Sequence, residues 1–354
     1  MSDKKHSIQY KDIGGQAVME GVMMQSPASE SIAIAVRRPS GRIVVTCEHK
    51  ELLSRKHPWM GWPIIRGCVN MVNMLAMGMK TLDRSTQMLG VLDEEPTKFE
   101  KWLAEKLGAS IDKVVMAVAM VLAVALSLGL FVALPSGAAT LAGKVVDNRI
   151  VINLIAGVVR IAILIGYMVA VGFVPDIKRV FMYHGAEHKT VYCNEAGLPL
   201  TPENARQFSR LHPRCGTAFL FLVMIISILI GSVADQVIYL IFGIEKLGFL
   251  LRFGRSLLLL PVVTGVSYEV LKALAHAGDH VIVRALRWPG LMLQHLTTRE
   301  PDDAMLEVAI ASMKAAKAGA AHYQENLDAG VYVYREDDAD GEAPVDGGEE
   351  RAAQ

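Results

Sequence analysis

The sequence has little of what three large classes of protein depend on. Four cysteines without a Cys-x-x-Cys pair are too few and too scattered for a disulfide framework, so we expect reduced thiols that face the cytosol. The 36 Lys and Arg residues are balanced by 36 Asp and Glu residues, which leaves no net positive charge to hold a nucleic acid. The first ten residues contain no apolar run typical of a secretory signal, so the segment after them is expected to stay in the cytosol.

Charge is also missing from three long apolar segments. These are residues 114–134, 150–174 and 218–234, and the one charged side chain among them is Arg160. A bilayer core about 30 Å thick needs about 20 apolar residues of helix, because lipid offers no partner to an unpaired backbone amide. The three segments are therefore predicted to be transmembrane helices, the first ending at Pro135 and the third at Asp235.

A fourth transmembrane helix is predicted at about residues 256–275, where Pro261, Glu269 and Lys272 interrupt the apolar pattern. The loop that joins the second and third helices carries more Lys and Arg residues than the loop that joins the first and second. By the positive-inside rule the former loop is cytosolic, and with four helices both termini are cytosolic as well.

The predicted fold class is thus a polytopic α-helical membrane protein of about four transmembrane helices with a small cytosolic N-terminal α+β part. We divide the chain into a cytosolic N-terminal part at residues 1–112, a transmembrane bundle at 113–275 with a cytosolic loop at 175–217, a cytosolic C-terminal helical part at 276–335 with a helix at about 301–318, and a disordered acidic tail at 336–354. The tail is assigned from its composition, since acidic residues among Gly, Ala and Pro do not form a core.

The N-terminal part contains two strand-like runs, residues 32–38 and 43–47, on either side of turn residues, which predicts a β-hairpin. The glycine-punctuated residues 14–24 predict a tight turn and a buried strand, while the alternative interpretation places Glu20 in an active site. Residues 64–89 predict either a helix along the lipid headgroups, with nearby tryptophans at the interface, or a core helix of the soluble part.

The residues best suited to chemistry lie at the two ends of the loop between the second and third helices. His184, Glu187 and His188 share one face if this segment is helical, and His212 and Cys215 come just before the third helix. Both groups sit at the membrane ends of a single loop, so they lie on the same side of the bilayer whichever way the protein is inserted.

This set predicts a divalent metal site, with zinc as the metal, since zinc takes nitrogen and sulfur ligands. His184 and His188 would hold the ion with Cys215 or His212 as a third ligand, and Glu187 would be the general base of a hydrolase. Two alternatives stay open. One is a closed structural zinc site that uses all four groups, and the other is a polar loop whose histidines bond to backbone or lipid phosphate without a metal.

Two further polar features need an explanation. The triplet of His276, Asp279 and His280 repeats the spacing after the fourth helix, and either completes a site or interacts with a helix end. Arg160 is costly inside lipid and requires a partner, and we expect Glu269 to supply it, either along a transport path or to fix the helix register.

Five segments carry a likeness to a known family. They are residues 14–24 (GGQAVMEGVMM), 183–189 (YHGAEHK), 211–217 (LHPRCGT), 261–269 and 289–303. In these segments the chain resembles the YqhQ-like family of bacterial membrane proteins, over about residues 13–313. The resemblance implies a bacterial cytoplasmic membrane, and a family of unknown function whose members are described as predicted metal-dependent enzymes.

The prediction for function is a metal-dependent enzyme, hydrolytic, at the cytosolic face of the membrane. Its partners would be membrane lipid and an unknown protein or lipid-linked substrate, with no nucleic acid. The alternatives are a non-catalytic membrane scaffold with a structural metal site, and a transporter that depends on Arg160 and Glu269.

Overall fold

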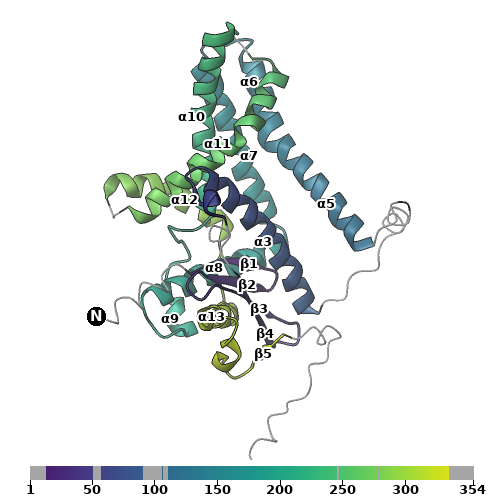
Figure 1. Cartoon of the computed structure of the whole chain (residues 1–354), viewed down its shortest axis with the longest axis vertical. Helices are drawn as coiled ribbons and strands as arrows, with labels where there is room; N and C mark the ends of the chain where they lie inside the picture. Colours follow the sequence, from purple (N-terminus) through teal and green to yellow (C-terminus); the bar gives the residue numbers. More distant parts are fainter. Residues whose placement is uncertain are drawn as a thin grey trace, which may run out of the picture.

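The computed structural model describes residues 13–50, 57–90, 106, 111–244, 247–277 and 280–334. It consists of a helical bundle at one end and a layered α/β part at the other (Figure 1). The tail expected at residues 336–354 lies outside the described residues, as does Asp279 of the second histidine triplet.

Four helices of the described chain are long and apolar enough to cross a membrane, as predicted. The corresponding stretches are Ala117–Ala142, Arg149–Val171, Phe219–Phe242 and Phe249–Leu274. The first is built from α5 (Ile111–Leu128), one π-helical turn (Gly129–Ala133) and α6 (Leu134–Ala142), and the others are α7 (Arg149–Val171), α10 (Thr217–Phe242) and α11 (Phe249–His276).

Two predicted helix ends are wrong. Pro135 does not end the first apolar helix, because it stands in the first turn of α6, directly after the π-helical turn, where a missing N–H removes no needed bond. Asp235 does not end the third, because its carboxylate is buried and paired with Arg252 and Arg255 of α11.

The α/β part is built on a five-stranded sheet in the order β1-β2-β3-β4-β5. The strands are β1 (Gly14–Val18), β2 (Gly21–Ser26), β3 (Ser31–Arg37), β4 (Ile43–His49) and β5 (Val331–Val333). The predicted hairpin is confirmed as β3 and β4, with Ala33 opposite Cys47 and Arg37 opposite Ile43. β5 comes from the other end of the chain and pairs with β4 in parallel, whereas the remaining pairs are antiparallel.

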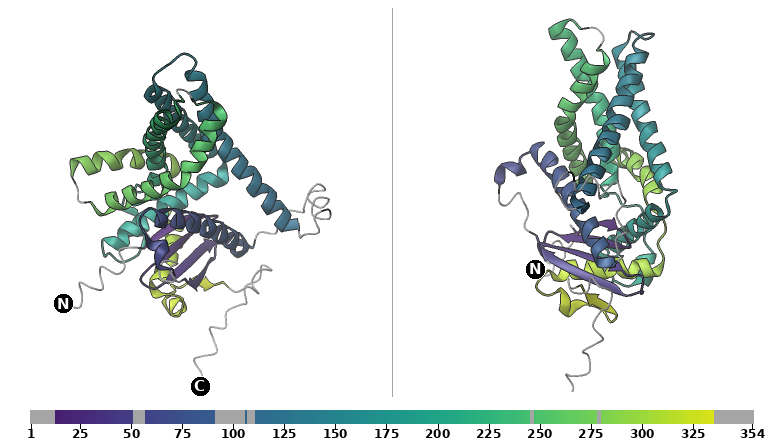
Figure 2. Two further views of the ribbon diagram at one scale, coloured as in Figure 1. Left: turned by 45° about the horizontal axis from the view of Figure 1, so that its top comes forward. Right: turned by 90° about the vertical axis from the view of Figure 1, so that its right-hand side faces the viewer.

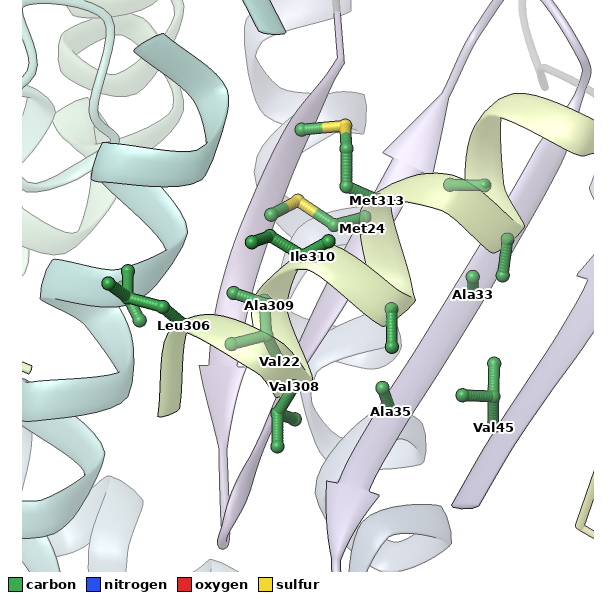
Figure 3. Close-up of a cluster of buried hydrophobic side chains, with 14 of the residues drawn as sticks. Val22, Met24, Ala33, Ala35, Val45, Leu306, Val308, Ala309, Ile310 and Met313 are labelled. Atoms are coloured by element: carbon green, nitrogen blue, oxygen red, sulfur yellow. The ribbon is translucent and has the colours of Figure 1, made fainter. Parts of the chain in front are cut away.

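Helices cover both faces of this sheet. Alternation along the strands sends Val22 and Met24 to one face, where they pack with α13 (Asp303–Ala318) through residues such as Met313 (Figure 3). α8 (Pro175–Glu195) packs on the same core. The opposite face, with Met23 and Ile34, packs on Met88 of α3 (Ile65–Leu89). Figure 2 shows the sheet between these helical layers.

α3 has features of both structures predicted for residues 64–89, a helix along the lipid headgroups and a core helix of the soluble part. Met88 and Ser85 are buried toward the sheet, while Val72 and Leu75 on the other side of the helix are 63% and 62% exposed. The helix therefore closes a core with one face and leaves a second, apolar face uncovered. Short elements complete the described chain: η1 (Pro58–Gly61), α9 (Pro202–Arg206), α12 (Val281–Thr297) and η3 (Tyr323–Asn326).

The start of α3 fastens the α/β part to the bundle. Arg66 pairs with Glu269 of α11, and Gly265 lets the helices approach so closely that an added Cβ there would lie 2.3 Å from Ile64 Cγ2. The expected pair between Arg160 and Glu269 is therefore wrong. α7 and α11 both begin at the bundle end that is remote from the sheet. At 1.5 Å per residue, Arg160 lies about 16 Å along α7 from that end, whereas Glu269 lies about 30 Å along α11. The two side chains are therefore at different depths in the bundle.

Candidate metal centre

The candidate centre forms where α8, the segment that precedes α10 and the end of α12 meet. Gly185 of α8 makes this approach possible, because a Cβ at this position would lie 2.1 Å from the backbone oxygen of Arg299. The Arg299 N–H donates to the Phe181 carbonyl at 2.8 Å, which holds the chain after α12 against α8. The polar middle of α8 is thereby buried: Glu187 and His188 are 5% and 2% exposed.

Both histidines of α8 have one ring nitrogen fixed by a backbone carbonyl. His184 Nδ1 lies 2.9 Å from the Thr297 oxygen, and His188 Nδ1 lies 2.5 Å from the Arg210 oxygen. A carbonyl only accepts, so each Nδ1 carries the proton and each Nε2 keeps a free lone pair. Metal-bound histidines are commonly oriented by such a bond from the second nitrogen.

Cys215 faces the free nitrogen of His184. Its Sγ lies 3.3 Å from His184 Nε2 and accepts from the Thr217 backbone N–H at 3.5 Å, where α10 begins. The donor atoms of His184, His188 and Cys215 all lie within 4.8 Å of one another.

Glu187 lies beside this donor set without belonging to it. Its Oε2 is 3.5 Å from His188 Nε2, the nitrogen that remains free for a metal. The carboxylate is packed against β1, since a Cβ added to Gly15 would lie 2.8 Å from Glu187 Cγ. A buried carboxylate is thus held next to the place where an ion and its water would sit.

His212 stands behind the centre. Its Nδ1 accepts from the Arg214 backbone N–H at 3.3 Å, so the proton is on Nε2, which points to Glu195 at 3.5 Å. Burial lowers the pKa of His212, which keeps the ring neutral. Neither nitrogen joins the three donors, and the ring lies with its centroid 5.6 Å from that of His188.

Gln294 of α12 is a positioning residue that the sequence alone did not indicate. Its side chain accepts from the His212 N–H and donates to the His212 carbonyl, each at 2.8 Å. These two hydrogen bonds to the backbone fix the loop that carries Cys215. The Thr297 and Arg210 carbonyls were missed as well, because every residue has a carbonyl and no residue type marks the two that orient the histidines.

The other predicted site residues lie elsewhere. Glu20 occupies the β1–β2 turn with φ of 49°, pairs with Arg179 and accepts from the Tyr183 hydroxyl at 3.3 Å, so it fastens α8 to the sheet. Arg160 lies inside the bundle, where it donates to Ser227 Oγ at 2.9 Å. Glu269 lies at the joint with α3.

The donor set fits zinc. Two imidazole nitrogens and one thiolate are ligand types that zinc prefers, and three protein ligands leave a position open, as in catalytic sites. Both imidazoles have the tautomer that such a site requires, and the three donor atoms lie within 4.8 Å of one another.

Comparisons with known proteins agree with the likeness seen in the sequence motifs. Residues 62–318 match the family described as "Protein of unknown function (DUF1385)". The chain is similar to a Bacillus subtilis (strain 168) protein described as "Uncharacterized protein YqhQ", with 34% identity over 303 residues, 84% of this chain and 90% of that protein. No solved structure matches the chain.

Proposed function

The chain belongs to the DUF1385 family of proteins of unknown function, and since that membership names no reaction, we propose from the geometry of the candidate centre that the protein is a metal-dependent hydrolase of the membrane surface. The observation that carries the proposal is the convergence of two oriented imidazoles and one cysteine sulfur beside a buried carboxylate. That combination supplies both a metal site and a base.

Each residue has a defined task in this proposal. His184, His188 and Cys215 hold the ion, and the Thr297 and Arg210 carbonyls keep the imidazoles in the binding tautomer. A zinc ion, when bound, supplies a Lewis acid that makes water acidic near neutral pH. Glu187 Oε2, 3.5 Å from His188 Nε2, would act as the general base and would hold the proton at this point of the site.

The substrate belongs to the membrane surface. α12 leaves large apolar side chains uncovered, among them Ile282, Leu286 and Trp288 at 74%, 55% and 59% exposure, and its far end carries Thr297 of the centre. Apolar helix faces beside a transmembrane bundle suit the headgroup region, with tryptophan at the interface. We therefore propose a lipid-linked or membrane-bound protein substrate, at the cytosolic face of a bacterial cytoplasmic membrane.

Two rival functions share parts of this evidence. A scaffold with a structural metal would need a fourth protein ligand, and the described residues place His212 toward Glu195 instead. A transporter was expected to use a pair of Arg160 and Glu269, which lie apart. The three-donor set with an adjacent base favours the hydrolase.

The test combines metal analysis with substrate turnover. The full chain purified in detergent is expected to contain one equivalent of zinc, and His184→Ala and Cys215→Ala are each expected to lose it. Glu187→Gln keeps the shape of the side chain but removes its negative charge, and it should retain zinc. When bacterial membranes are incubated with each protein and analysed by mass spectrometry, the parent should release hydrolysis products that Glu187→Gln does not release, with a rate loss of roughly a hundredfold or more.

The outcomes separate the hydrolase from the scaffold. Zinc content that is unaffected in both ligand variants contradicts the centre itself. Equal zinc and equal products in the parent and Glu187→Gln contradict a base at Glu187. Zinc in the parent with no hydrolysis products in any preparation supports the scaffold. Gln294→Ala is a useful companion variant, since it should loosen the Cys215 loop and weaken zinc binding without removing a ligand.

A further inference from the structure

The second polar cluster of the protein lies inside the helical bundle. Asp235 of α10 is 2% exposed and accepts from Asn153, Arg252 and Arg255. The cluster is separate from the candidate metal centre, because Asp235 lies about 27 Å along α10 from Thr217 at 1.5 Å per residue.

Positive charge exceeds negative charge in this cluster. The cluster contains three arginines, Arg160, Arg252 and Arg255, and one carboxylate, that of Asp235. Among the described residues, Arg160 forms no ion pair and donates to the Phe131 carbonyl and to Ser227 Oγ instead. The guanidinium groups repel one another, Arg252 acting on Arg160 and Arg160 on Arg255. Arginine stays protonated even when buried, so the excess amounts to two positive charges. Uncompensated charge at this depth in a membrane is expensive.

Several donors of the cluster are also unused. Arg252 Nε, Arg255 Nε and Ser136 Oγ are buried, and none has a hydrogen-bond partner among the described residues. Arg252 is 5% exposed and Ser136 is 1% exposed, so solvent does not replace the missing partners. Buried polar groups without partners cost free energy unless an ion or water satisfies them.

These groups surround a small cavity. Its lining includes Ser136, Asn153, Arg160, Ser227, Arg252 and Arg255, and its volume is about 10 Å³, close to what one water molecule needs. Guanidinium groups, a hydroxyl and an amide all offer N–H or O–H donors to whatever occupies it. A cavity with positive walls and spare donors selects a negative occupant of small size.

We propose that the bundle holds a single halide-sized anion, such as chloride, between Arg160, Arg252 and Arg255. The anion supplies a second negative charge beside Asp235 and accepts from the unused donors. It therefore stabilises the packing of α6, α7, α10 and α11, which contribute the lining. The inference is independent of the metal centre and of the hydrolase.

The test measures unfolding temperature of the detergent-purified full chain at constant ionic strength, while chloride replaces gluconate. A ligand that binds the native state raises the midpoint with saturation, so we expect a saturable rise with chloride and with bromide. Arg160→Met should shift the half-saturating chloride concentration several-fold upward. Arg42→Glu, at the exposed β3–β4 turn, is the control and should respond like the parent.

Arg160→Glu provides the sharpest outcome. The substitution removes one positive charge and adds one negative charge, so the cluster is neutral without an anion and the unfolding midpoint of this variant should not respond to chloride. A parent midpoint that does not depend on halide overturns the proposal, and so does an Arg160→Glu variant that responds like Arg42→Glu. Stabilisation by phosphatidylglycerol but not by halide also overturns it, in favour of a lipid phosphate.

Discussion

The four thiols of the protein differ in burial and therefore in reactivity. Cys47 and Cys193 are buried, and burial raises the pKa of both thiols, that of Cys47 to about 11, so they stay protonated near neutral pH. Cys68 and Cys215 are partly exposed. Of these two, Cys215 alone lies against an imidazole nitrogen and a helix N-terminus.

This difference predicts that zinc protects one thiol from alkylation. With zinc bound, Cys215 should resist N-ethylmaleimide, and a chelator should raise its alkylation rate by roughly tenfold or more, because the metal no longer occupies the sulfur. Mass spectrometry of the peptides measures each site separately. Cys68 is the internal control, since it donates to the Pro261 carbonyl at 3.0 Å and is not one of the three donors, so its rate should not change.

His184→Ala extends the same experiment. Without that imidazole, Cys215 should be alkylated at the chelated rate even when zinc is present. Equal rates for Cys215 with and without chelator in the parent would contradict its role as a ligand.

At this scale the sequence predicted that His184, His188 and Cys215 lie together, but it did not predict all of their neighbours. The spacing of His184, Glu187 and His188 places them on one helical face, and α8 is helical there. Their junction with Cys215 was also expected from the loop. Arg160 was given the wrong partner, because hydropathy places each charge in a helix but not at a depth relative to charges in other helices. Its contact with Ser227 required coordinates.

At the scale of elements, the crossing of α8 with the end of α12 decides the geometry of the centre. Gly185 lies at this crossing, one residue after His184, and the carbonyl that orients His184 belongs to Thr297. Any side chain at Gly185 must push Arg299 away. The orientation of His184 therefore depends on a residue that binds nothing itself.

Gly185→Ala is predicted to lower both stability and metal content. An added Cβ would lie 2.1 Å from a backbone oxygen, so the free energy of unfolding should fall by about 1–3 kcal/mol, the usual cost of overpacking. Zinc content should fall with it, because Thr297 moves away from His184. Thermal unfolding and elemental analysis measure the two effects.

Gly166→Ala is the matched control. Gly166 is also helical, in α7, and a Cβ there meets no atom within 4 Å. This variant should keep its zinc and its unfolding midpoint. If Gly185→Ala behaves the same way, the crossing does not constrain the centre.

Local signals also failed at two helix ends, for reasons that belong to this scale. Proline and aspartate are sound stop signals in isolation. At Pro135 the preceding π-helical turn lets the helix resume, and at Asp235 two arginines of α11 neutralise the charge. The π-helical turn and the two arginines cannot be predicted from the residue types next to Pro135 and Asp235.

At the scale of the whole molecule, the two ends of the chain build one α/β part. β5 joins β4, and Ser29 of the β2–β3 turn and Ser31 of β3 donate to the Ala316 carbonyl of α13 at 2.6 and 2.7 Å. The helix at 301–318 and the hairpin were expected separately. Their union was not, because a three-residue strand has no periodicity to recognise and its partner lies far away in sequence.

This arrangement puts the soluble elements at one end of the bundle. The sheet, α8 and α13 lie below the apolar helices in Figure 1, whereas the turn between α6 and α7 lies at the opposite end. If the four apolar helices cross the membrane, that turn and the sheet must face opposite compartments. The positive-inside rule assigns the sheet to the cytosol.

Cysteine labelling tests this assignment with two exposed positions. Lys144→Cys, in the exposed turn between α6 and α7, should react with a membrane-impermeant maleimide in intact spheroplasts if the predicted topology is right. Arg42→Cys, between β3 and β4, should react only in inverted vesicles. The parent chain sets the background from its own thiols. The reverse pattern would place the metal centre outside the cytosol. Labelling of both positions from the same side would mean that an even number of membrane crossings separates them, and not the single crossing by α5 and α6 that this topology requires.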